Sequence, residues 1–337
     1  MRIVYDELYG DHLRGIPHPE SPGRVEAVAD FLRRNGRFEN VITPRDATAE
    51  EIERVHAPGY VDLVRAEAAS MADFAGYLST GDTVIDVRSF DVARRAAGGA
   101  VVAMETAMHQ GGSAFAIVRP PGHHADARRG MGFCIFNNAA IAARAAQAQF
   151  GVRSLIVDFD YHHGNGTQAV SGDGLSYVST HAFPAYPGTG GRDENYALPE
   201  RDAIVNVPLP PHDFGTEAFV ALWERLLVAT AARVRPDLLI VSAGFDYVTG
   251  DPAGDLGVGV EAASHLGALI DRVAREYCGG RVAYVLEGGY DLEALACSVA
   301  AIIEAHDAPQ TGEPSSAEDS AIPAPQRELL ETIETLD

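Results

Sequence analysis

The residues best suited to chemistry in this 337-residue chain are a short run of acids and a histidine. Asp158, Asp160 and His162 alternate with aromatic residues directly after the apolar segment 154–157. In an extended strand alternate side chains point to the same face, so we expect the three to converge. Two carboxylates and an imidazole suit a divalent metal, and a catalytic zinc takes about three such ligands and leaves one position open. Two buried acids held only by hydrogen bonds are the alternative, but they would need a strong counter-charge.

Another acid follows a second apolar segment. Asp246 comes after 238–242 and Ala-Gly-Phe. A lone Asp at such a place is often a turn residue or a helix cap. The carboxyl ends of parallel strands meet at one edge of a sheet, however, and this placement makes Asp246 a candidate third ligand beside Asp160 and His162. Asp251-Pro252 is interpreted as turn chemistry.

Two adjacent histidines, His123 and His124, follow the rigid turn Pro120-Pro121-Gly122. A general base near neutral pH with a charged neighbour is the functional interpretation. Asp158 and Asn165 are candidate partners of the two rings, and an Asp partner favours imidazolium more than an Asn partner does.

One tyrosine completes the set. Tyr290 follows Glu287-Gly-Gly at the end of a further apolar segment. It could be a packed aromatic residue, but two glycines let the backbone place a phenol over a site. There it would donate a hydrogen bond to a developing oxyanion.

Apolar runs rich in Val and Ile predict the strands that position these residues. Such runs without alternation are typical of strands buried on both faces. Helical patterns with cap and stop residues lie between them, and this alternation predicts an α/β fold with a parallel sheet. The predicted strands are Arg2–Tyr5, Ala114–Val118, Ser154–Phe159, Ser176–Thr180, Ala203–Val207, Leu238–Ser242 and Val282–Leu286.

The formal net charge is −22, and all 26 basic residues are arginine. Such a charge repels nucleic acid and anionic lipid, so we expect neither as a partner, and it favours a cationic substrate. Three separated cysteines, no apolar run of about 18 residues and no signal core predict a reduced, cytoplasmic protein without a membrane span. Residues 307–337 are acidic, and the part 307–324 is rich in Pro and Ser, which predicts a mobile tail. One short helix is expected near 326–336.

Ordered motifs along residues 1–306 resemble the histone deacetylase family, which includes acetylpolyamine amidohydrolases and acetoin-utilisation proteins. The resemblance implies an arginase-like single domain over 1–306, with a central parallel sheet of about eight strands. The motifs are His18-Pro-Glu-Ser-Pro-Gly-Arg24, Arg119-Pro-Pro-Gly-His-His-Ala125, Gly132-Phe-Cys-Ile-Phe-Asn-Asn138, Val157 to Thr167, Pro187-Gly-Thr-Gly190, Ser242-Ala-Gly-Phe-Asp246 and Leu286-Glu-Gly-Gly-Tyr290.

The resemblance also implies roles. Asp160, His162 and Asp246 resemble the family's zinc ligands, with Fe²⁺ as an alternative ion in the cell. His124 resembles the general base and acid, and His123 its electrostatic partner. The remaining implied site residues are Asp158 and Asn165 behind the histidines, Tyr290 as carbonyl-polarising donor, and Asp82, Gly132, Phe133 and Tyr186 on the substrate tunnel and rim. A structural K⁺ near Asp158, Asp160, His162 and Ser179 is a further family expectation.

These features predict a zinc-dependent amidohydrolase that removes acetyl or other acyl groups from acyl-lysine in a protein or peptide. An acetylpolyamine deacetylase is the first alternative, although the short segment between His181 and Val205 favours acyl-lysine. A non-catalytic acyl-ligand sensor and a binuclear manganese ureohydrolase are further alternatives. The ureohydrolase would carry Asp-x-His-x-Asp, whereas this chain has Asp-x-Asp-x-His. The sequence gives no indication of an oligomeric partner.

Overall fold

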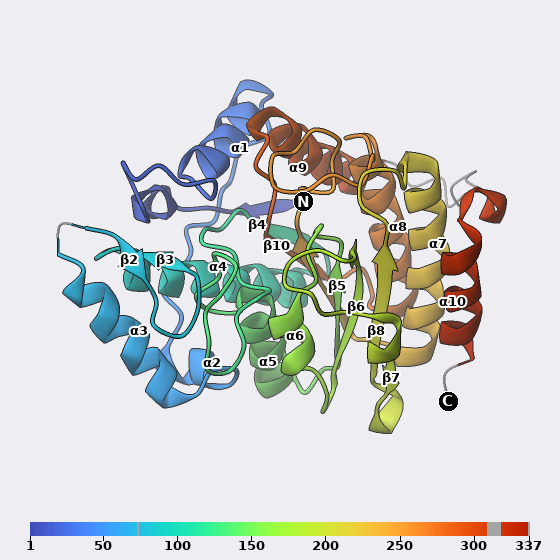
Figure 1. Ribbon diagram of the computed structural model, residues 1–337, viewed down its shortest axis with the longest axis horizontal. Coiled ribbons are helices and arrows are strands. Elements are labelled where there is room, and N and C mark those ends of the chain that lie inside the picture. The colour runs from blue at the N-terminus through green and yellow to red at the C-terminus, as the bar shows by residue number, and fades with distance from the viewer. Residues whose placement is uncertain (73, 309–317, 336–337) are drawn as a thin grey trace.

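The computed structural model describes residues 1–72, 74–308 and 318–335 and contains an eight-stranded sheet (Figure 1). The strand order is β1-β4-β10-β9-β5-β6-β8-β7, and all neighbours pair in parallel except β8 and β7. The predicted fold class is therefore confirmed. The strands are β1 Arg2–Val4, β4 Ser113–Ala116, β5 Ser154–Asp158, β6 Leu175–Ala182, β7 Tyr196–Ala197, β8 Ala203–Leu209, β9 Leu238–Ala243 and β10 Val282–Leu286.

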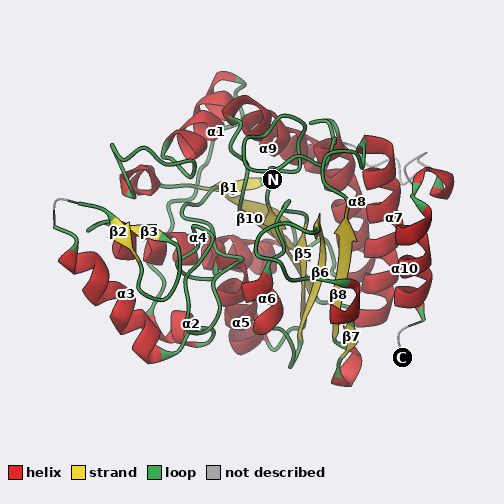
Figure 2. Ribbon diagram, viewed as in Figure 1, coloured by secondary structure: helices red, strands yellow, loops and turns green. Residues whose placement is uncertain are grey.

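Helices cover both faces of this sheet (Figure 2). Helices α4 and α5 lie on one face, and α1, α9, α8 and α7 form a layer on the other. The central strands β5, β9 and β10 are buried along their whole length, as their apolar sequences predict. The helices on these faces are α1 Gly23–Arg34, α4 Ser89–Gln110, α5 Asn138–Phe150, α7 Thr216–Val234, α8 Ala262–Tyr277 and α9 Leu292–Asp307.

Smaller elements complete the described chain. A two-stranded hairpin of β2 (Gly76–Tyr77) and β3 (Val84–Ile85) stands beside the carboxyl edge of the main sheet. The remaining helices are α2 Ala49–Glu53, α3 Pro58–Ser70, α6 Asn165–Ala169 and α10 Ala324–Glu334. Among the helices of the described residues, none has the length and hydropathy needed to cross a membrane.

Helix α10 lies against α7 and β8. Its Leu330 and Ile333 are buried, and Arg225 of α7 pairs with Glu334 at 2.5 Å. Residues 309–317, within the tail expected to be mobile, lie outside the described residues. The division of the chain into a catalytic domain 1–306 and a tail 307–337 stays a prediction.

One local expectation is wrong. Strand β5 ends at Asp158, so Asp160 and His162 lie in the following loop rather than in an extended strand. The cause is local hydrogen bonding, because Asp158 Oδ1 accepts from the N–H of Asp160 at 3.2 Å and Asp160 Oδ1 accepts from the N–H of His162 at 2.9 Å. Hydrogen bonds of this kind, from a backbone N–H to an Asp side chain two residues earlier, form turns in place of the backbone hydrogen bonds of a strand.

Candidate active site

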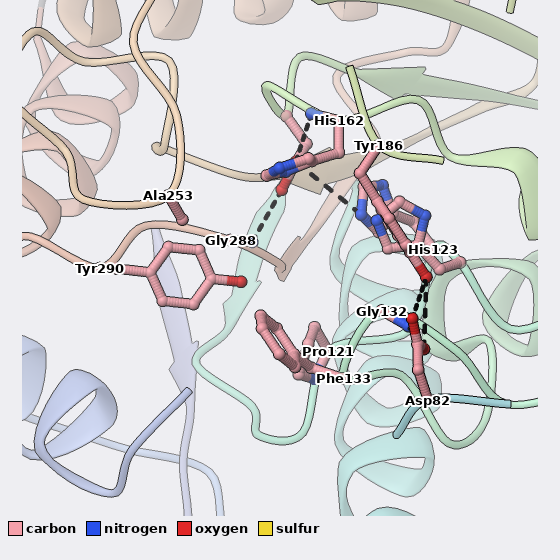
Figure 3. Close-up of a pocket in the computed structure, with 12 residues that line it drawn as sticks. Asp82, Pro121, His123, Gly132, Phe133, His162, Tyr186, Ala253, Gly288 and Tyr290 are labelled. Atoms are coloured by element: carbon pink, nitrogen blue, oxygen red, sulfur yellow. Dashed lines mark hydrogen bonds and ion pairs between the residues drawn. The ribbon is translucent and has the colours of Figure 1, made fainter. Parts of the chain in front are cut away.

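A cavity of about 300 Å³ opens at the carboxyl edge of the sheet, where β4, β5, β9 and β10 end (Figure 3). Loops that are far apart in sequence supply its walls. They follow β4, β5, β6, β9 and β10, whose carboxyl ends parallel pairing aligns, and the turn between β2 and β3 adds Asp82. The lining residues are Asp82, Pro121, His123, His124, Gly132, Phe133, Asp160, His162, Tyr186, Ala253, Gly288 and Tyr290.

Three ligand-type side chains converge on the cavity floor. Donor atoms of Asp160, His162 and Asp246 all lie within 4.8 Å of one another. The Nδ1 atom of His162 stands 2.9 Å from Asp246 Oδ2 and 3.2 Å from Asp160 Oδ1. The structure therefore brings together the three residues that were expected to hold a metal.

The surroundings of this group fit a small cation. A Cβ atom added to Gly288 would stand 2.5 Å from Asp246 Oδ2 and 2.6 Å from Asp160 Oδ2, so only glycine leaves room for these carboxylates. Burial and the negative charge of Asp160 raise the pKa of Asp246 to about 6. A divalent cation would relieve the repulsion between the two buried acids, and Asp and His are ligands that zinc accepts.

Asp158 lies apart from this group. Its Oδ2 atom is 3.2 Å from His123 Nδ1 and accepts a hydrogen bond from the Tyr177 hydroxyl at 3.0 Å. We expected the side chains of Asp158, Asp160 and His162 to converge on one point. That expectation is wrong for Asp158, because strand β5 ends at this residue and the chain then turns. Its position behind His123 is the one expected for a partner of that ring, and its catalytic role stays a prediction.

The two adjacent histidines have different partners and opposite pKa shifts. Although burial opposes protonation of His123, the carboxylates of Asp160 and Asp158 raise its pKa to about 10. His124 Nδ1 lies 2.8 Å from the side-chain oxygen of Asn165, which can only accept, so Nδ1 carries the proton and Nε2 keeps a free lone pair. Burial, together with the positive charge of His123, holds the pKa of His124 well below its usual value.

Tyr290 stands on the opposite wall, and its hydroxyl points into the cavity (Figure 3). Burial raises the pKa of this phenol well above its ordinary value, against the opposing charge of Arg24. The guanidinium carbon of Arg24 lies 4.8 Å from the ring centroid. The hydroxyl is therefore protonated near neutral pH and able to donate a hydrogen bond.

The predicted rim residues also meet at this cavity. The Phe133 ring lies edge-on to Tyr290, with 5.9 Å between centroids, and the Tyr186 ring lies edge-on to His124 at 5.2 Å. Asp82, between β2 and β3, stands between Gly132 and Tyr186 at the mouth (Figure 3). Their roles toward a substrate stay predictions.

Sequence reasoning missed one supporting residue. The buried Asp251, interpreted as turn chemistry, accepts hydrogen bonds through Oδ2 from the N–H groups of Tyr290 at 2.6 Å and Asp291 at 2.9 Å. It also forms the expected turn, since Oδ1 accepts from the N–H of Ala253 at 2.9 Å. The Asp-Pro pattern indicated the turn, but no local signal pointed to a contact with a segment 39 residues away.

Fold and site together define a hydrolase with a candidate metal group at the sheet edge. Residues 18–306 match the family model described as a histone deacetylase domain. The chain belongs to the histone deacetylase family, whose members are generally metal-dependent, and is a hydrolase acting on amide bonds.

Named relatives support this assignment. The chain is 37% identical to histone deacetylase 15 of Arabidopsis thaliana over 87% of its own length and 53% of the relative's. It is 35% identical to a probable deacetylase of Archaeoglobus fulgidus, over 86% of this chain and 81% of that one. The polyamine deacetylase HDAC10 of Mus musculus is 36% identical over 85% of this chain and 44% of the relative. The crystal structure of the HDA15 HD domain covers 99% of this chain and 93% of its own, with 33% identity and a TM-score of 0.85.

Proposed function

We propose that this protein is a zinc-dependent deacylase that removes acetyl or other acyl groups from acyl-lysine in peptides or proteins. One observation carries the proposal: Asp160 and His162, with Asp246 directly behind them, lie at the floor of a cavity that the neutral His124 and the Tyr290 phenol also line. A sensor without catalysis would have no use for a base and a hydrogen-bond donor placed on opposite walls.

The chemistry follows from these positions. A zinc ion held by the three ligands would polarise the acyl carbonyl and lower the pKa of a water molecule. His124 Nε2 takes the proton of the attacking water and later delivers it to the departing amine. Tyr290 donates its hydroxyl hydrogen to the oxyanion that develops on the carbonyl oxygen. His123, paired with Asp158, holds the positive charge that keeps His124 neutral before attack.

The walls of the cavity suit an alkyl chain. Pro121, Phe133 and Tyr186 line the passage between the mouth and the floor, and they offer rings to the methylene groups of a lysine side chain. Among the lining residues, the carboxylates are Asp160 at the floor and Asp82 at the mouth. This distribution favours a neutral chain with polar groups at its outer end, as in acyl-lysine within a peptide.

Acetylated polyamine is the second candidate substrate. A relative named polyamine deacetylase matches the chain at 36% identity, and the net charge of −22 attracts cationic amines. Turnover of acyl-lysine peptides and acetylpolyamines by metal-free protein reconstituted with zinc tests both candidates. Hydrolysis of peptides with higher kcat/KM supports the first, and the reverse order supports the second. Ligand binding without any turnover would indicate a sensor, and two manganese ions per chain a ureohydrolase.

A further inference from the structure

The side-chain amide of Asn165 has two different ends, and each end meets a different partner. Its oxygen Oδ1 lies 2.8 Å from Nδ1 of His124. Its nitrogen Nδ2 donates a hydrogen bond to the sulfur of Met131 at 3.5 Å. Asn165 therefore joins the proposed base to a methionine in the loop before Phe133.

The orientation of this amide decides where His124 carries its proton. With the amide oxygen toward the ring, Nδ1 must donate and Nε2 keeps its lone pair. If the amide were rotated by half a turn, its NH2 group would face Nδ1, which would then have to accept. The ring proton would stay on Nε2, and that atom could not take a proton from water.

Of the two partners, Met131 is the one that distinguishes the orientations. A neutral imidazole can donate or accept at Nδ1, so His124 can bond to either end of the amide. A thioether sulfur has lone pairs and no hydrogen, so it only accepts. In the rotated amide the oxygen would face the sulfur with no hydrogen between them. Water would not select an orientation either, since it both donates and accepts.

The backbone holds the loop of Met131 beside the His124 ring. The carbonyl oxygen of Met131 accepts from the N–H of Cys134 at 2.9 Å. At Gly132 the backbone is left-handed, with φ +55°, and an added Cβ would stand 2.4 Å from Cδ2 of His124. Met131 itself is half-buried, and Asn165 is the first residue of α6. The contact between Nδ2 and the sulfur thus joins two segments whose positions other contacts fix.

We infer that Met131 is a positioning residue for the base. Its sulfur accepts from Asn165 Nδ2, which turns the amide oxygen toward His124 and leaves Nε2 of that ring free to take a proton. This inference rests on the proposed deacylase function, because it explains how the base of that reaction obtains its tautomer.

Three substitutions of Met131 change what this side chain offers to the amide, and kcat is measured on an acetyl-lysine peptide. Met131→Leu removes the acceptor at similar volume, so the two orientations become about equally populated and kcat should fall about twofold. Met131→Lys offers a charged donor and favours the rotated amide, which should lower kcat about ten- to a hundredfold. Met131→Glu offers an acceptor again, and its kcat should stay within about threefold of wild type.

An Asn165→Asp background shows whether Met131 acts through the amide. A carboxylate has two equivalent oxygens, so it accepts from His124 Nδ1 in either orientation. In this background Met131→Leu should leave kcat unchanged, and Met131→Lys should lower it by less than about threefold. Met108→Lys is the matched control, since Met108 is likewise half-buried but lies near the end of α4, which leads into the start of β4 rather than its carboxyl end. It should leave kcat unaffected.

The tautomer of His124 can also be measured without turnover. Long-range hydrogen–nitrogen correlations in NMR spectra of histidine-labelled protein distinguish a ring protonated at Nδ1 from one protonated at Nε2, and loss of the signal in His124→Gln identifies it. Wild type should carry the proton on Nδ1, and Met131→Lys should carry it on Nε2.

Three outcomes would overturn the inference. Equal losses of kcat in Met131→Lys and Met131→Glu would reduce Met131 to a packing residue. An undiminished effect of Met131→Lys in the Asn165→Asp background would show that Met131 does not act through the amide. A His124 ring that keeps its proton on Nδ1 in Met131→Lys would refute the selection of the tautomer. Wild-type protein that shows the change of tautomer but hydrolyses no acylated substrate would refute the deacylase function alone.

Discussion

Asp251→Asn should impair catalysis although Asp251 is absent from the cavity lining. Tyr290 follows Gly288 and Gly289, and Gly289 has φ +116°, so the backbone before the phenol has unusual freedom. The bonds from the N–H groups of Tyr290 and Asp291 to Asp251 Oδ2 restrict that freedom. Weakening them should let the phenol leave the position from which it donates.

The size of the effect follows from the bonds that change. A hydrogen bond to a charged acceptor contributes about 1.5–3 kcal/mol, and a neutral amide oxygen keeps roughly half of that. With two bonds weakened, we expect a loss of about 2 kcal/mol of stability. If the same energy separates the productive from the unproductive position of Tyr290, kcat falls by up to about thirtyfold, with KM less affected.

Steady-state kinetics on an acetyl-lysine peptide and urea unfolding measure the two effects. Asp255→Asn is the matched control, because Asp255 lies in the same loop and accepts from the N–H groups of Gly250 at 3.0 Å and Gly257 at 2.7 Å instead of those of Tyr290 and Asp291. It should lower stability and spare kcat. An Asp251→Asn variant that loses stability with unchanged kcat, or that loses as much kcat in a Tyr290→Phe background, would refute the reasoning.

Three further predictions follow from the site and the buried histidines. Tyr290→Phe should lower kcat by roughly two or more orders of magnitude, the loss of an oxyanion donor, and near-normal turnover in steady-state assays would contradict it. Chelation should abolish turnover and zinc should restore it, with elemental analysis giving one ion per chain in wild type and none in Asp246→Ala. Burial lowers the pKa of His56 to about 4 from 6.5, so the unfolded chain binds the extra proton and stability falls as the pH drops below 6.5. From pH 7 to pH 5 the free energy of unfolding of His56→Gln, measured with urea, should fall by about 2 kcal/mol less than that of wild type. Equal decreases in the two proteins would contradict this.

The strands could be predicted because their signal is local. Each central strand is rich in Val, Ile or Leu and is buried on both faces, so the sequence pattern and the burial coincide. The 22-residue helix α4 gave no comparable signal. It has Gly98 and Gly99 at its centre, and these are required by close packing, since a Cβ at Gly98 would stand 1.9 Å from the carbonyl oxygen of Arg45. Contacts of this kind depend on the tertiary structure and leave no periodic pattern.

Part of the candidate site could likewise be predicted from the sequence, and part could not. The ligand group could be predicted because each member directly follows a strand, and parallel pairing brings strand ends together. The place of Asp158 behind His123 was expected. Its separation from Asp160 and His162 was not, because it depends on turns that begin where β5 ends. The hydrogen bond from the N–H of Tyr290 to Asp251 could not be predicted either, because the two loops that it joins come together only in the folded chain.

The histidine pair shows how two adjacent identical side chains acquire opposite pKa shifts. The rings of His123 and His124 lie 4.0 Å apart, so two positive charges would repel each other strongly in this buried place. Asp158 offers His123 a full negative charge, whereas Asn165 offers His124 only a dipole. The proton therefore goes to His123, and His124 stays neutral with a free Nε2. One carboxylate and one amide behind adjacent rings thus favour a positive charge on the first ring and leave the second neutral, as the proposed base requires.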